Sequence, residues 1–148
     1  MSENNAPPPD LSRFITAQRG VYHTALQELN EGCKRTHWMW YIFPQVAGLG
    51  FSETSRFYAI HNRAEARQYL AHELLGKRLV TCCEAVLALE GKSIHDIFGS
   101  PDDMKMKSCI TLFASLSAPG SVFERILNKY FQGRPDERTL EILTLMDD

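Results

Sequence analysis

The sequence predicts an all-α fold, built as a single compact domain of about seven or eight helices. Apolar residues recur at helical spacing along most of the chain, and capping residues precede several of these segments. No segment alternates apolar and polar residues as a half-buried strand would. With 148 residues, of which 44% are hydrophobic, the chain can bury one ordinary core. The proline-rich residues 1–9 predict a disordered tail before a domain at 10–148.

The helical segments follow one another with ordinary start and stop residues. In order, they cover about residues 10–32, 37–43, 53–60, 63–71, 73–89, 101–117, 121–131 and 136–146, and residues 93–98 form about a single turn. The first segment has the clearest amphipathic face and ends at Gly32, whereas Pro44 interrupts the second. Side chains suited to N-capping precede the first four segments, namely Asp10, Thr36, Ser52 and Asn62.

The second half of the chain has stronger breaks. Gly91 ends the segment 73–89, and Gly76 within it marks either a break or a close contact between helices. Residues 100–103, with the sequence SPDD, form the clearest helix start, since serine can cap, proline suits the first position and acids suit the positive end of the helix dipole. Proline and glycine pairs separate the last helices from their neighbours: Pro119, Gly120, Gly133 and Pro135.

Charge and composition exclude several classes of partner. A formal net charge of −2 gives no global field to attract nucleic acid, so a nucleic-acid partner is not expected. No apolar run approaches the roughly 18 residues of a membrane span, and no membrane association is predicted. The polar start, MSENNAPPPD, lacks the apolar core of a secretory signal. Four cysteines without a zinc or haem spacing predict free thiols, a cytoplasmic location, and neither a metal nor a cofactor.

Residues 35–53, RTHWMWYIFPQVAGLGFSE, concentrate aromatic side chains in an unusual way. A short helix that is apolar on all sides is normally buried, which indicates a central core helix. The alternative is that Trp38 and Tyr41 stack on the flat part of a ligand, while Gly48 and Gly50 allow the backbone to approach it. The two interpretations are compatible, because one side of the helix can pack while another lines a pocket.

Three cations are candidates to hold the anionic part of such a ligand. Lys34 precedes the aromatic block, and Arg78 lies on the segment 73–89. Lys105 falls within the apolar arc of its helix, where it either snorkels or pairs with Asp102, or reaches a buried anion near the helix N-terminus. Ser108 lies outside that arc on the same helix and is a further candidate ligand contact.

Acid–base chemistry, if any occurs, has two candidates. His37 adjoins the aromatic block, and an imidazole there can exchange a proton near neutral pH. Asp103, at the helix start, is the other candidate. A structural role, as a cap or a hydrogen-bonded side chain, is the alternative for His37. No nucleophile elbow, phosphate-binding loop or zinc-helix motif is found in the chain.

The blocks HWMWYIFPQVAGLGFS, RFYAI, EARQYLAHELLGKRL, IFGSPDDMK and TLF resemble a bacterial domain-of-unknown-function family, number eighteen-ten, whose members are sometimes labelled calpastatin. The resemblance covers about residues 11–143 and implies a compact all-α fold. It supplies no activity, cofactor or catalytic residue. The chain departs from the family pattern at Glu73, Cys109 and Ile110, so no role is assigned to a hydroxyl at position 109. Calpain-inhibiting calpastatins are disordered and repetitive, unlike this chain, and the label is therefore rejected as a function.

Two functions from different classes are consistent with these residues. In the first, the domain binds a small anionic ligand such as a nucleotide or sugar-phosphate derivative, with hydrolysis or transfer of that ligand as an extension of the same hypothesis. In the second, it is a non-enzymatic protein-interaction module whose aromatic block is core. A concave pocket that joins the aromatic block to the Lys105 helix would favour the first function, and a filled core with a flat apolar patch the second. The oligomeric state and the existence of catalysis stay open.

Overall fold

The computed structural model describes residues 10–146, and the predicted tail at 1–9 lies outside them. Within this range the chain is all-helical, as predicted, and has no strand beyond an isolated parallel bridge between Val46 and Ile60. The described residues form ten helices rather than seven or eight: α1 (Ser12–Gln18), α2 (Tyr22–Glu31), α3 (Met39–Ile42), α4 (Glu53–Phe57), α5 (Arg63–Ala71), α6 (Leu75–Ala88), α7 (Ile94–Phe98), α8 (Asp102–Ala114), α9 (Val122–Tyr130) and α10 (Glu137–Leu145).

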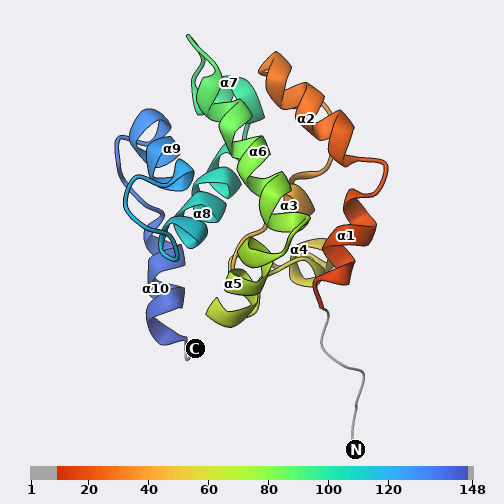
Figure 1. The fold of residues 1–148 in the computed structure, drawn as a ribbon. Helices are drawn as coiled ribbons and strands as arrows, with labels where there is room; N and C mark the ends of the chain where they lie inside the picture. The colour runs from red at the N-terminus through yellow and green to blue at the C-terminus, as the bar shows by residue number, and fades with distance from the viewer. Residues whose placement is uncertain (1–9, 147–148) are drawn as a thin grey trace, which may run out of the picture.

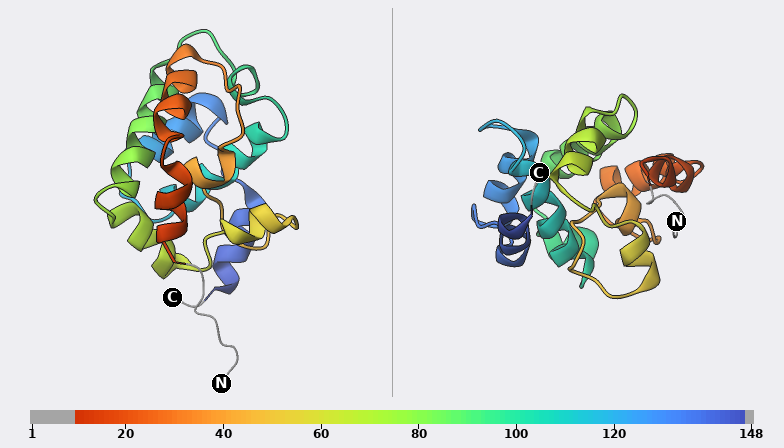
Figure 2. Two further views of the ribbon diagram at one scale, coloured as in Figure 1. Left: turned by 90° about the vertical axis from the view of Figure 1, so that its right-hand side faces the viewer. Right: turned by 90° about the horizontal axis from the view of Figure 1, so that it is seen from below.

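Helices α6 and α8 form the centre of a single compact fold. In Figure 1, α6 runs through the middle of the molecule with α2 on one side and α9 on the other, and it packs against α2, α5 and α9. Helix α8 packs against α5, α7, α9 and α10. Seen from below in Figure 2, the first and last helices lie on opposite sides of the molecule. No helix in residues 10–146 is long and apolar enough to cross a membrane.

The first predicted helix is divided in two. A turn at Gly20, with φ of +77°, separates α1 from α2, so the prediction of one helix over 10–32 is wrong. The apolar spacing continues across the turn, which is why periodicity alone did not detect the break. Asp10 is also not the N-cap, because Leu11 takes that position and the Asp10 carboxylate accepts the N–H of Ser12. The predicted end at Gly32 is confirmed, with φ of +82°.

The other predicted helix starts have mixed outcomes. Ser52 and Asn62 cap α4 and α5 as predicted, each accepting a backbone N–H from the first turn. Thr36 caps nothing, since its hydroxyl donates to Glu28 and α3 begins only at Met39. The α8 helix has Pro101 at the N-cap position and no side-chain cap, so the predicted role of the preceding serine is wrong.

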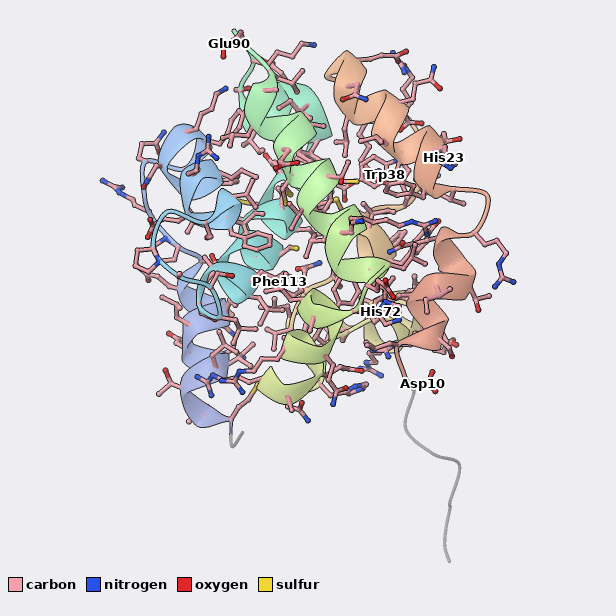
Figure 3. The ribbon with its side chains drawn as sticks, viewed as in Figure 1. Asp10, His23, Trp38, His72, Glu90 and Phe113 are labelled. Atoms are coloured by element: carbon pink, nitrogen blue, oxygen red, sulfur yellow. The ribbon has the colours of Figure 1, made fainter. Side chains whose placement is uncertain are left out.

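The core is rich in aromatic side chains. Trp38 and Phe43, from the aromatic block, are fully buried together with Phe14, Tyr69 and Phe113. Figure 3 shows Trp38 and Phe113 inside the bundle of helices. Helix α8 is buried on nearly every side, so residues 108–113 are all buried and its apolar residues are not confined to one arc. The aromatic block is thus core over much of its length.

Gly76 marks a close contact between helices, one of the two outcomes that the sequence predicted. A methyl group at this position in α6 would overlap the backbone carbonyl oxygen of Leu70 in α5. Because backbone cannot move aside as a flexible side chain can, we expect Gly76→Ala to lower the free energy of unfolding by about 2 kcal/mol or more. Urea denaturation followed by circular dichroism would measure it. The exposed neighbour is the control: Lys77→Ala should change stability by less than about 0.5 kcal/mol, and equal effects would contradict the packing argument.

Candidate functional site

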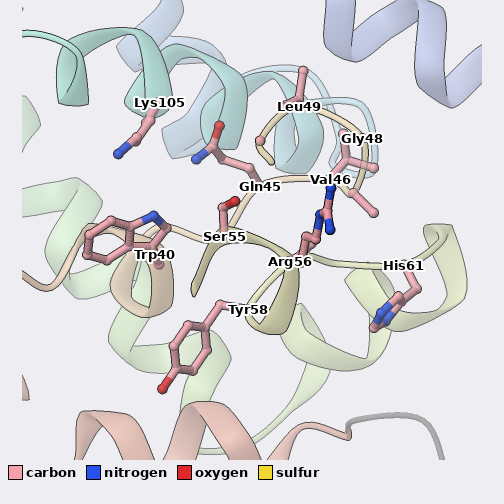
Figure 4. Close-up of a pocket in the computed structure, with 13 residues that line it drawn as sticks. Trp40, Gln45, Val46, Gly48, Leu49, Ser55, Arg56, Tyr58, His61 and Lys105 are labelled. Atoms are coloured by element: carbon pink, nitrogen blue, oxygen red, sulfur yellow. The ribbon is translucent and has the colours of Figure 1, made fainter. Parts of the chain in front are cut away.

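A cleft of about 320 Å³ opens beside the aromatic block (Figure 4). One wall is the loop 45–50, which follows α3, and the other wall is formed by residues of α4 and the segment after it, from Ser55 to His61. Trp40 of α3 and Lys105 of α8 complete the lining. The cleft therefore joins the aromatic block to the Lys105 helix, which is the arrangement that the ligand-binding hypothesis requires.

The two walls are joined by backbone hydrogen bonds. The Ala47 N–H donates to the Ile60 carbonyl, and the Ile60 N–H donates to the Gln45 carbonyl, each at 2.8 Å. Two glycines shape the loop between them. Gly48 adopts φ of +102°, and a Cβ at Gly50 would lie 2.6 Å from the Ser55 Oγ, so a side chain at either position would distort the wall.

Lys105 and Trp40 form one end of the cleft. The Lys105 Nζ lies 4.7 Å from the centre of the Trp40 ring, and its side chain is 26% exposed. The same Nζ lies 3.3 Å from Asp102 Oδ1, which confirms the pairing considered from the sequence. The other oxygen of Asp102 lies 2.9 Å from the Nζ of Lys34, whose side chain is almost completely buried. One carboxylate thus faces two ammonium groups. The three side chains together carry a net positive charge, and Lys105 is the more exposed of the two lysines.

Arg56 and His61 supply the remaining charged chemistry of the lining. The exposed Arg56 side chain has no hydrogen-bond or ion-pair partner among residues 10–146, and Figure 4 shows its guanidinium between Trp40 and His61. The His61 Nδ1 lies 3.1 Å from Glu65 Oε1. Sequence reasoning missed both residues, because an arginine on a short polar helix and an isolated histidine carry no pattern that sets them apart.

Glu65 is held as a carboxylate. Burial raises the pKa of this group, but the hydrogen bonds from Arg13 and from the His61 backbone N–H outweigh it and lower the pKa. The Arg13 Nη1 lies 3.0 Å from Glu65 Oε2. Arg13 itself is buried, and its other nitrogens donate to the Phe57 and Ala59 carbonyls at 2.7 and 2.8 Å. One guanidinium therefore fixes both Glu65 and the wall of the cleft.

The sequence model of the family described as "Protein of unknown function (DUF1810)" matches residues 8–143. The chain belongs to the DUF1810 family. Its fold is similar to the crystal structure of the conserved hypothetical protein Rv1873 from Mycobacterium tuberculosis, with a TM-score of 0.91 and 45% sequence identity over 95% of this chain and 100% of that one. No curated protein matches the chain. The resemblance noted in the aromatic block is thereby confirmed over nearly the whole domain.

In this DUF1810 protein, the two tryptophans of the block have different positions. Trp38 is fully buried, and its indole N–H donates to Glu28 Oε1 at 2.9 Å. Trp40, two residues later, is half-buried and lines the cleft. Tyr41 is half-buried beside Tyr58, with ring centres 5.3 Å apart, and lies outside the cleft lining. The aromatic residues that face the cleft are therefore Trp40 and Tyr58 rather than the Trp38 and Tyr41 named from the sequence.

The predicted cations and hydroxyl are dispersed over the DUF1810 fold. Lys105 lines the cleft, and Lys34 reaches it indirectly, through Asp102. Arg78 lies apart on α6, where its Nη1 donates to the Gln18 side chain at 3.2 Å and its guanidinium stacks on the Tyr22 ring. Ser108 is buried in α8, and its hydroxyl donates to the Met104 carbonyl at 3.2 Å.

The two acid–base candidates also lie outside the cleft lining. His37 is exposed, and its backbone carbonyl accepts the Tyr41 hydroxyl at 3.3 Å. Asp103 lies 3.2 Å from His95 Nδ1, and its other oxygen accepts the Met104 N–H. Neither residue lines the hollow that contains Trp40 and Lys105. The histidine that does line it is His61.

Proposed function

We propose that this cytosolic DUF1810 domain binds a small anionic ligand with a flat part, of the nucleotide or sugar-phosphate class, in the cleft between loop 45–50 and α4. The observation that carries the proposal is the convergence of Trp40, Arg56 and Lys105 on one hollow of about 320 Å³. A planar surface and two cations in a concave site are the groups that such a ligand requires. Lys105 is a cation that the sequence also named, whereas Trp40 and Arg56 replace the aromatic and basic residues named with it.

The flat part of the ligand would rest on Trp40. Its ring is half-buried, so one side packs against the protein while the other borders the cleft. Lys105 lies over the same ring, and a ligand that carries both a ring and an anion could contact both side chains at once. Tyr58, from the opposite wall, offers a second aromatic surface.

The anionic part of the ligand would extend from Lys105, over the Trp40 ring, toward Arg56. Arg56 has no partner in the described chain, and the carboxylate beside Lys105 is shared with Lys34, so the cleft has a local excess of positive charge although the whole chain has a net charge of −2. The backbone N–H groups of Gly48 and Gly50 likewise have no acceptor among residues 10–146. Free N–H groups beside cations are typical of sites that bind phosphate.

The proposal predicts a ligand whose binding depends on both ends of the cleft. We would follow the thermal unfolding of the protein with nucleoside mono-, di- and triphosphates, ADP-ribose and sugar phosphates. A ligand at 100 times its dissociation constant should stabilise the fold by about 2.7 kcal/mol, which raises the melting temperature by roughly 5–10 °C. Arg56→Ala and Lys105→Ala should each weaken binding at least about tenfold, because each removes a charged hydrogen bond.

The matched control is Lys107→Ala, on the same helix. Its Nζ lies over the Phe131 ring, away from the cleft, so the dissociation constant should not change. If the ligand bound Arg56→Ala and Lys105→Ala as tightly as the wild-type protein, it would bind elsewhere. If no compound in the panel raised the melting temperature, the proposal of a nucleotide or sugar-phosphate ligand would fail.

A second candidate function is the non-enzymatic interaction module. One observation favours it: Phe51, next to the cleft loop, is 79% exposed, and Phe57 on α4 is also exposed. Aromatic side chains at the surface are enriched at protein interfaces. Under this hypothesis, a partner captured from cell extract would be lost with Phe51→Ser, and the melting temperature would not respond to the small ligands.

A further inference from the structure

We infer that His61 is the acid–base residue of the cleft and that the protein hydrolyses a phosphate ester or phosphoanhydride bond at the anionic end of its ligand. The inference rests on the proposed function, since it assigns a reaction to the same site. It differs from the sequence-based assignment to His37 or Asp103. Three features of the structure support it: the partner of the imidazole, the rigidity of that partner, and the place of the ring in the cleft.

The partner of His61 determines which ring nitrogen carries the proton. Nδ1 lies 3.1 Å from Glu65 Oε1, and an ionised carboxylate can only accept a hydrogen bond. The neutral imidazole therefore keeps its proton on Nδ1, which leaves a lone pair on Nε2. Within the described part of the chain, Nε2 has no hydrogen-bond partner. A histidine oriented by a carboxylate, with a lone pair free on the second nitrogen, has the arrangement of a general base.

The carboxylate that orients His61 is itself fixed. Glu65 Oε2 lies 3.0 Å from Arg13 Nη1, and the Arg13 side chain is almost completely buried. Because Arg13 also binds the Phe57 and Ala59 carbonyls, it holds the segment that carries His61 in a constant position relative to Glu65. We describe Glu65 and Arg13 as positioning residues, since they act through His61 rather than on the ligand.

A purely structural role explains only part of this arrangement. Glu65 Oε1 also accepts the His61 backbone N–H at 2.7 Å, so the carboxylate stabilises the turn before α5. That contact needs no imidazole, and any residue at position 61 could provide it. His61 nevertheless lines the cleft as well as the neighbouring hollow that contains Glu65, and the Arg56 guanidinium lies between His61 and Trp40 in the view of Figure 4. His61 therefore lies beyond Arg56, at the end of the cleft away from Trp40 and Lys105, where a phosphoryl group that extends from a ligand on Trp40 would meet it.

The reaction that this geometry serves is attack by water. His61 Nε2 takes a proton from a water molecule while its oxygen forms a bond to the phosphorus. The bond from phosphorus to the leaving oxygen breaks, and its electron pair stays on that oxygen. The proton on Nε2 then passes to the leaving oxygen, so the imidazole returns to its neutral form. Arg56, whose guanidinium lies between Trp40 and His61 in the view of Figure 4, compensates the charge that develops on the phosphoryl oxygens.

Nuclear magnetic resonance of the histidine rings tests the positioning directly. In protein labelled with nitrogen-15, at a pH where the ring is neutral, we expect His61 to carry its proton on Nδ1. In Glu65→Gln, the His61 ring should no longer prefer this tautomer. The pair formed by His95 and Asp103, with Nδ1 at 3.2 Å from the carboxylate, is the internal reference and should not change in that variant. A neutral His61 with its proton on Nε2 would overturn the inference, whatever the ligand.

Turnover tests the chemistry. The nucleotides and sugar phosphates that raise the melting temperature would be incubated with the protein, and products separated by anion-exchange chromatography. We expect His61→Gln to reduce turnover at least about 100-fold while the ligand still raises the melting temperature. His95→Gln, outside the cleft, should keep full activity. Binding without turnover in the wild-type protein would overturn the hydrolysis alone, whereas an absence of binding would overturn the proposed function as well.

Discussion

Trp38→Ala is expected to lower the free energy of unfolding by about 3–5 kcal/mol, which is roughly 10 °C in melting temperature for a domain of this size. The side chain is fully buried, and its ring packs against Phe43 and Phe98, with centres 6.1 and 6.4 Å away. Its indole N–H also donates to Glu28. The substitution therefore leaves a cavity and removes one of the hydrogen bonds of a buried carboxylate.

Urea denaturation followed by far-ultraviolet circular dichroism would measure this loss. Trp40→Ala is the matched comparison, because the same residue type lies two positions away, half-buried at the cleft. We expect it to destabilise the fold much less than Trp38→Ala and to lose the ligand response instead. Similar losses of stability in the two variants would contradict the division of the block into a core side and a cleft side.

The second large effect is expected at Glu28, which organises the chain between α2 and α3. The carboxylate accepts hydrogen bonds from the Arg35 and Thr36 N–H groups, the Thr36 hydroxyl and the Trp38 indole, over distances of 2.7–3.1 Å. Burial alone raises its pKa, but these donors outweigh burial and lower the pKa to about 2. Glu28 thus stays ionised in the core, and four donors depend on it.

The depressed pKa determines the direction of the pH dependence. Because the folded protein holds the Glu28 proton more weakly than the unfolded chain does, the stabilisation is complete above about pH 5 and is lost as the pH falls toward 2. Its size at neutral pH is on the order of 2–3 kcal/mol. Glu28→Gln should lose this stability at pH 7 and show a shallower dependence on pH below 5.

Chemical denaturation between pH 7 and pH 3 checks the prediction. Glu31→Gln, on the same helix, is the control, because that exposed carboxylate pairs with Arg35 at the surface and its loss should have little effect at any pH. If both variants followed the wild-type pH dependence, another group would be responsible for the acid response, and the Glu28 cluster would contribute only packing.

Several helices could be predicted because their signals are local. Ser52, Asn62, Ser121 and Asp136 each cap a helix by accepting an N–H from the first turn, and such a bond depends on few residues. The break at Gly20 and the start of α3 were not predicted. The apolar spacing continues unchanged across Gly20, so periodicity does not detect the first, and at the second the Thr36 hydroxyl donates to Glu28 instead of capping the helix.

The candidate site was predicted in part, for a related reason. The residue types suggested an aromatic wall and a cation, but the sequence left open whether the aromatic block and the Lys105 helix share a pocket, and the structure brings them to one cleft. The sequence named Trp38 rather than Trp40. Trp38, at the N-cap of the four-residue helix α3, is buried, whereas Trp40 within the helix lines the cleft. The direction of so short a helix is set by its neighbours and not by its own spacing.

The sequence by itself determined that the chain is all-α, that it forms one core rich in aromatic residues, and which family it belongs to, since these follow from spacing, composition and contiguous blocks. Only the tertiary structure decided which tryptophan faces the cleft, that Asp102 joins Lys34 to Lys105, and that Arg13, Glu65 and His61 meet. The physical reason is separation along the chain. Arg13 and Glu65 are brought together by the packing of α1 against the segment before α5, and no local pattern records a contact of that kind.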